Sequence, residues 1–128
     1  MLVLQNAYWN VDVDKTRHLV RVKRTAERLK AIDELDAVFG ELVKSIKDIQ
    51  KNQYGLLIDL RDGPFRNDEA FETAIRKHTV ELLNGWRKSA LLMKTAVGAL
   101  QAGRQARETG TAQNLFRDED EAIQFLES

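Results

Sequence analysis

A nearly continuous hydrophobic segment, residues 56–60, lies near the middle of the chain and is interrupted only by Asp59. A short apolar run of this kind is typical of a strand buried on both faces, because a half-exposed strand alternates apolar and polar residues. Residues 61–64 then end the strand, since they include Gly and Pro, which interrupt strand pairing. Asn67 or Asp68 next provides an N-cap oxygen for a helix. We therefore predict a central strand, a charged loop at its carboxyl end and a capped helix.

Two segments that precede this strand alternate between apolar and polar side chains. They cover residues 7–13 and 18–25, and the polar residues 14–17 between them suit a tight turn. This pattern predicts an N-terminal antiparallel hairpin with one buried face. The side chains predicted on that face are Trp9, Val11, Val13, Val20 and Val22.

Apolar residues spaced alternately three and four apart predict an amphipathic helix after the hairpin. They are Ile32, Leu35, Phe39, Leu42, Ile46 and Ile49. Asp33 is the predicted N-cap. The same spacing suits a coiled-coil seam, but it ends within three heptads, which favours a helix packed on the core of its own domain.

The remaining segments continue the alternation of helix and strand. We predict a helix over residues 69–86, a strand over 90–95, a helix of small residues over 98–107 closed by Gly110, and a strand over 114–116. Asp118 with Glu121 resembles a capping box and predicts a last helix. That helix buries Ile123 and Leu126, or Phe125 in a slightly rotated register.

This order of elements predicts an α/β domain spanning residues 1–128. The N-terminal antiparallel hairpin leads into a mixed, mainly parallel sheet, with about four helices mostly on one face, because right-handed crossovers that step in one direction stay on one side. We expect Leu57, Leu91 and Met93 to share the other face. Either another element covers them or they form a contact surface for a second chain.

Composition narrows the classes of function. Twenty basic residues balance twenty acidic ones along 128 residues, which argues against a nucleic-acid binder with a basic stripe. The chain has no cysteine, so it has no disulfide and no thiolate metal site. The apolar start is too short for a signal peptide, and no apolar run approaches the length that spans a bilayer. We expect a cytoplasmic domain with no membrane insertion.

The order of elements resembles the STAS fold, the sulfate-transporter and anti-sigma-factor-antagonist domain, and within it the small bacterial SpoIIAA-like proteins. The resembling segments are residues 20–25, 58–68 (Ile-Asp-Leu-Arg-Asp-Gly-Pro-Phe-Arg-Asn-Asp), 91–101 and 116–122. The resemblance implies a single SpoIIAA/STAS-like α/β domain without enzymatic activity, which acts as a regulatory or protein-interaction module.

The chain departs from the family at the start of the helix after the central strand. Members that are switched by phosphorylation carry Asp-Ser-Ser/Thr-Gly there, whereas this chain has residues 67–70, Asn-Asp-Glu-Ala, without a hydroxyl group. The phosphorylation switch is therefore not carried over. Asp68 either imitates a phosphorylated residue or caps the helix. Related lipid-binding domains keep a ligand-binding alternative open.

The candidate ligand or partner site lies at the carboxyl rim of the sheet. Its residues are Asp59, Arg61, Asp62, Asn67, Asp68, Lys94, Thr95 and Gly98. Asp59 and Arg61 lie about 7 Å apart on one strand face and can pair. The rim either holds a structural ion pair or, with a cation beside a helix start, binds a small anionic or lipid-like ligand.

No other group of residues forms a catalytic or metal motif. His18 and His78 lie on separate elements without a cysteine, and we expect His78 on a solvated helix face. None of the three serines sits on a strand-to-helix elbow. We expect no cofactor, no metal and no catalytic residues. The predicted partner is an unidentified protein, with a homodimer as a further expectation and a small anionic or lipid-like ligand as the alternative.

Overall fold

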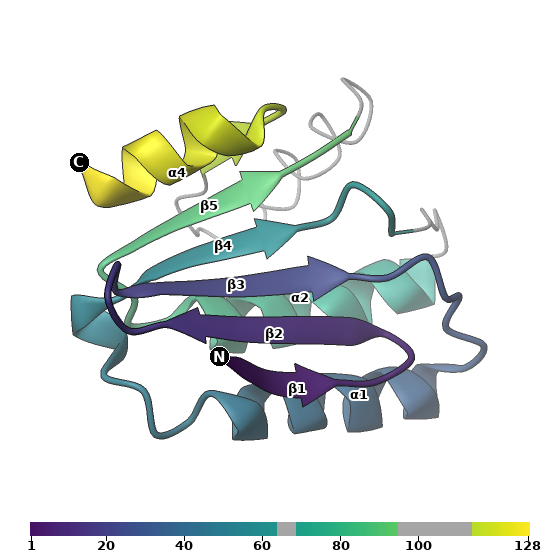
Figure 1. Ribbon diagram of the computed structural model, residues 1–128. Helices are drawn as coiled ribbons and strands as arrows, with labels where there is room; N and C mark the ends of the chain where they lie inside the picture. Colours follow the sequence, from purple (N-terminus) through teal and green to yellow (C-terminus); the bar gives the residue numbers. More distant parts are fainter. Residues whose placement is uncertain (64–68, 95–113) are drawn as a thin grey trace.

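The strands form one sheet in sequence order, β1-β2-β3-β4-β5-β6, in the computed structural model of the chain (Figure 1). The structure describes residues 1–63, 69–94 and 114–128. The strands are β1 (Leu2–Gln5), β2 (Trp9–Asp14), β3 (Leu19–Arg24), β4 (Gly55–Asp59), β5 (Lys88–Leu92) and β6 (Asn114–Phe116). The first three pair antiparallel, and β3 to β6 pair parallel. The predicted hairpin and mixed sheet are confirmed.

The helices of the described residues are α1 (Ile32–Ser45), α2 (Glu69–Leu83) and α4 (Glu119–Glu127), with a 3-10 turn η1 (Lys51–Gln53) before β4. Each α-helix lies where the hydrophobic spacing predicts it. α1 and α2 end a few residues earlier than predicted, although Ile46, Ile49 and Trp86 beyond their ends still pack on the core. The predicted helix over residues 98–107 and its cap Gly110 lie outside the described residues. No helix in the described ranges is long and apolar enough to cross a membrane.

The larger core lies between the sheet and the pair α1 and α2. The five hairpin residues predicted to face inward all point to this side, together with Leu56 and Ile58 of β4, because alternate residues of a strand share one face. Leu19 of β3 points to the opposite face. The predicted helical stripe packs against the inward-facing residues from Leu35 to Ile49, and the rings of Trp9 and Phe39 meet edge to face with centroids 5.5 Å apart. Burial of this stripe is what holds α1 on the sheet.

A second, smaller core lies on the opposite face, where α4 covers β4 and β5 (Figure 1). Leu57, Ala90 and Leu92 of the sheet pack there against Ala122 and Leu126 of α4. Leu57 is fully buried, so of the two outcomes expected for it, cover by another element is the one observed.

The prediction that Leu91 and Met93 share a face with Leu57 is wrong. The parallel register pairs Leu57 with Ala90 and Ile58 with Leu91. Leu91 and Met93 therefore point into the core beneath α1 and α2.

Two local features at element starts also differ from prediction. The N-cap of α1 is Ala31, which makes no side-chain hydrogen bond, and the predicted cap Asp33 lies inside the first turn. A carboxylate in that turn still interacts favourably with the helix dipole, so Asp33 stabilises the start without capping it.

β1 was not predicted, because four residues are too few for a clear alternation. The predicted cap of the last helix is confirmed, since the Asp118 carboxylate accepts a hydrogen bond from the Asp120 N–H at 3.0 Å.

Candidate functional site

The most buried charged side chain of the described residues is Asp59, at the end of β4, with 2% of its surface exposed. Arg61, two residues on, binds it in a bidentate manner. Its Nε donates to Oδ1 at 3.0 Å and its Nη2 to Oδ2 at 2.9 Å. The backbone N–H of Arg61 donates to the same Oδ1 at 3.1 Å. The predicted ion pair between Asp59 and Arg61 is therefore present.

Asp59 and Arg61 each stabilise the charged form of the other. Burial opposes ionisation of Asp59, but hydrogen bonds from the side chain and backbone of Arg61, with the charges of Arg61 and Lys23, outweigh it and lower the pKa of Asp59. The hydrogen bond to Asp59 in turn raises the pKa of Arg61. Both carboxylate oxygens of Asp59 are occupied, so this group is not a free base.

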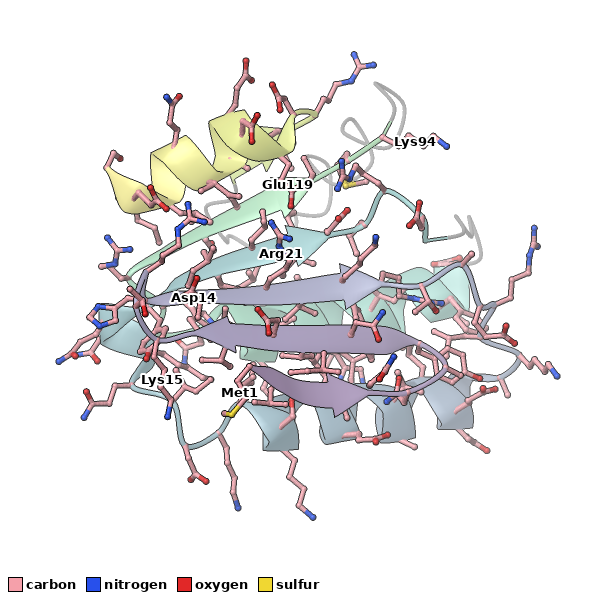
Figure 2. The ribbon with its side chains drawn as sticks, viewed as in Figure 1. Met1, Asp14, Lys15, Arg21, Lys94 and Glu119 are labelled. Carbon is pink, nitrogen blue, oxygen red and sulfur yellow. The ribbon has the colours of Figure 1, made fainter. Side chains whose placement is uncertain are left out.

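Further ion pairs extend from Arg61 across the carboxyl ends of the strands. Arg61 Nη2 lies 3.7 Å from the Glu119 carboxylate at the start of α4, and Glu119 also pairs with Arg21 of β3. Lys23 Nζ lies 3.6 Å from the Asp62 carboxylate. Figure 2 shows Arg21 and Glu119 approaching each other from β3 and α4. The loop after β4 is thus tied to β3 on one side and to α4 on the other.

Arg24, a residue that was not predicted to matter, supports the same loop from beneath. It is 8% exposed, and its guanidinium donates to the carbonyl oxygens of Tyr8, Thr25 and Glu27. Desolvation by burial lowers the pKa of Arg24, against the opposing charge of Glu27. Gly63 packs on it so closely that a Cβ there would lie 2.9 Å from Arg24 Cγ. The sequence signal for this contact is the shared parity of Arg24 with Val20 and Val22, which points it inward.

The predicted rim residues are brought together only in part. Asp59, Arg61 and Asp62 lie together in the ion-paired loop. Lys94 follows β5, is exposed and points outward (Figure 2), with no ion-pair partner among the described residues. The other predicted site residues, Asn67, Asp68, Thr95 and Gly98, lie outside the described residues, so the capping and phosphate-imitating roles of Asp68 stay predictions.

Neither histidine is one of the predicted rim residues. His78 is not on a solvated face as predicted: its side chain is 13% exposed, its Nε2 lies 2.6 Å from Asp36 Oδ1, and its ring stacks on Phe39. It joins α2 to α1. His18, in the hairpin turn, lies against the ring of Tyr54. The described part of the chain holds no group of three or more residues that could ligate a metal ion.

Comparison with known proteins supports the fold. No protein-family model matches the chain, and no curated protein matches it. Among solved structures, it is similar to an uncharacterized protein of the DUF3478 family with a SpoIIAA-like fold, from Shewanella loihica PV-4. The similarity covers 96% of this chain and 98% of that one, with a TM-score of 0.63 and 13% sequence identity. The chain therefore has the SpoIIAA-like fold, as the resemblance in its sequence implied.

Proposed function

We propose that this domain is a non-enzymatic regulatory module of the STAS type that binds another protein through its charged carboxyl rim. We define the rim surface as Arg21, Lys23, Arg61, Asp62, Lys94 and Glu119. The observation that carries the proposal is the bidentate pair of Arg61 with the buried Asp59. This pair fixes the loop that follows β4 and presents the charges of the rim surface.

The state of Asp59 argues against catalysis at the rim. A general base needs a free lone pair within reach of the proton that it removes. Asp59 has 2% of its surface exposed, and hydrogen bonds from Arg61 occupy both of its oxygens. Its role is therefore to position Arg61 and the loop that follows.

The exposed charges around this pair favour recognition of a protein. The side chains of Lys23 and Asp62 are 44% and 53% exposed, and Lys94 is also exposed. Ion pairs on both sides hold the loop in one geometry, so little conformational entropy is lost when a partner binds. A rim with both signs of charge gives orientation and specificity rather than bulk affinity.

The anionic or lipid-like ligand remains the alternative, with less support. Arg61 is engaged by Asp59, which leaves Lys94 as the cation of the predicted rim that is free among the described residues. A single exposed lysine gives little anion affinity. Such a ligand would need further groups from outside the described residues.

Charge reversal that leaves net charge unchanged tests the proposal. Asp62→Lys with Lys94→Glu reverses two exposed charges of the rim surface, and Glu41→Lys with Lys44→Glu makes the same change on exposed positions of α1. Each purified protein is used as bait in an extract of its native cells, and captured proteins are quantified by mass spectrometry. We expect at least one protein that the wild type and the α1 variant retain equally and the rim variant loses about tenfold, equivalent to about 1.4 kcal/mol.

Two results would contradict the proposal. Equal capture by all three proteins would show that binding does not involve the rim surface. Specific capture by none of them would argue against a protein partner. In the second case, a thermal shift with inorganic phosphate or anionic lipid vesicles that Lys94→Glu abolishes would support the ligand alternative instead.

A further inference from the structure

Among the described strands, β1 forms one edge of the sheet and pairs only with β2 (Figure 1). Exposed edges usually carry a lysine, a proline or a covering element that prevents pairing with another chain. Residues 2–5, Leu-Val-Leu-Gln, contain neither a charge nor a proline. Met1 and Leu2, 69% and 53% exposed, are two of the three exposed large hydrophobic residues of the described chain. The third is Val80 on α2.

The main-chain groups of Leu2 point away from β2. Met1 and Val13 exchange hydrogen bonds: the Met1 amine donates to the Val13 carbonyl at 2.7 Å, and the Val13 N–H donates to the Met1 carbonyl at 2.8 Å. In an antiparallel pair, hydrogen-bonded and non-hydrogen-bonded positions alternate. Leu2, which faces Asp12, is the next position. Its N–H and C=O therefore face the open edge.

Gln5 has the same orientation at the other end of the strand. The Asn6 N–H donates to the Trp9 carbonyl at 3.0 Å, and Gln5 faces Asn10 in the neighbouring pair. A bulge between Leu2 and Leu4 shifts the alternation by one residue. As a result the two residues with outward main-chain groups are Leu2 and Gln5.

We propose that β1 is a homodimer interface in which two copies pair their β1 strands antiparallel about a twofold axis. Leu2 of one copy exchanges hydrogen bonds with Gln5 of the other, and the reverse exchange occurs across the axis. A twofold interface must be complementary to itself, and these two positions satisfy each other reciprocally. In this pairing the bulges of the two strands would face each other. Residues 2–5 carry no charge, so no like charges oppose when the strand pairs with its own copy, and this favours a second copy as the occupant.

The expected dimer is weak and independent of the rim surface. A pair of four-residue strands buries far less area than a typical stable interface, so we expect a dissociation constant on the order of 10–100 µM. β2 separates β1 from β3, and the rim surface starts at β3, so a dimer leaves the rim free for another protein. Failure of the dimer therefore leaves the proposed function unaffected.

Sedimentation velocity from about 5 µM to 0.5 mM tests the dimer in solution. We expect a concentration-dependent shift from monomer to dimer for the wild type. Leu2→Lys puts a charge at each end of the paired strands, the change by which natural edge strands prevent pairing, and should weaken association at least tenfold. Val80→Lys adds the same charge at the remaining exposed hydrophobic residue and should leave association unchanged. A wild type that stays monomeric throughout, or a dimer that Leu2→Lys leaves intact, would overturn the proposal.

Cysteine crosslinking tests the register, and the chain has no native cysteine to interfere. Cα atoms of a hydrogen-bonded antiparallel pair lie about 5.5 Å apart, within the range of a disulfide. The variant with Leu2→Cys and Gln5→Cys should form a covalent dimer under mild oxidation, whereas Val80→Cys should not. Equal crosslinking of both variants would show random collision and count against the proposed pairing.

Discussion

The charged residues around Asp59 hold one another in place, because the backbone brings Asp59, Arg61, Glu119 and Arg21 within ion-pairing distance of each other. Asp59 is the clearest case: the strand buries its carboxylate, and Arg61 keeps it ionised. This contact was predictable, since two residues on one strand face are neighbours in any fold. The contacts of Arg24 and Glu119 were not, because they join elements far apart in sequence.

Asp59→Asn removes the charge from this pair and should lower the free energy of unfolding at pH 7 by about 2 kcal/mol. Because the folded state lowers the pKa of Asp59, the stabilisation is fully present above the unfolded pKa of about 4 and is lost as pH falls through the folded pKa. The difference between wild type and variant should therefore shrink below about pH 4. Urea unfolding curves of both proteins, recorded between about pH 2 and 7 at intervals of about one pH unit, measure this difference.

The control for that measurement is Asp62→Asn. Asp62 is about half exposed, and it lies 3.6 Å from Lys23, so its removal should cost less than about 0.5 kcal/mol at any of these pH values. Similar losses for both variants would mean that burial does not distinguish the two carboxylates.

Gly63→Ala tests the contact beneath the loop. The added Cβ would lie 2.9 Å from Arg24 Cγ, and Arg24 is held by three backbone carbonyls, so the clash has no easy relief. We expect a loss of about 1–2 kcal/mol. Gly40→Ala in α1 is the matched control: nothing lies within 4 Å of its Cβ, and alanine in a helix should stabilise by about 0.5–1 kcal/mol. Thermal unfolding of both variants should show shifts of opposite sign.

At the scale of an element, α4 is held at both ends. Asp118 caps its start. Arg87 Nη2 donates to the Leu126 carbonyl at 2.8 Å, and Lys88 Nζ to the Ser128 carbonyl at 2.8 Å. These bonds satisfy carbonyl oxygens that have no partner within a helix end. The cap was predictable from local sequence, but the anchoring by Arg87 and Lys88 was not, because it depends on where α4 lies.

Asp118→Ala should destabilise the domain by about 1 kcal/mol, since the N–H of Asp120 loses its acceptor. Asp120→Ala removes a carboxylate of the same turn without removing the cap, and should cost about 0.3 kcal/mol through the helix dipole. Chemical unfolding followed by circular dichroism separates the two values. Equal effects would mean that charge, rather than the hydrogen bond, explains the role of Asp118.

At the scale of the whole molecule, local sequence patterns determine the individual elements but not how two elements are placed relative to each other. Hydrophobic spacing predicts α1, β4 and the hairpin correctly, because each is specified by residues close in sequence. The face assignment of Leu91 and Met93 failed because strand register is a property of two strands together. The position of α4 depends in the same way on the sheet that it covers.

Leu126→Ala tests whether the two cores form one cooperative unit. β4 contributes Leu56 and Ile58 to the larger core and Leu57 to the smaller one, so loss of either core removes support from the same central strand. Truncation of the fully buried Leu126 should cost about 2–5 kcal/mol.

Both tryptophans pack on the α1 and α2 side, away from α4, so their fluorescence reports the other core. We expect tryptophan fluorescence and far-ultraviolet circular dichroism to shift together to the same lower urea midpoint. Gln124→Ala on the exposed side of α4 should leave both midpoints unchanged. If the circular dichroism of the Leu126→Ala protein changes while its fluorescence midpoint stays at the wild-type value, α4 unfolds separately and the cores are independent.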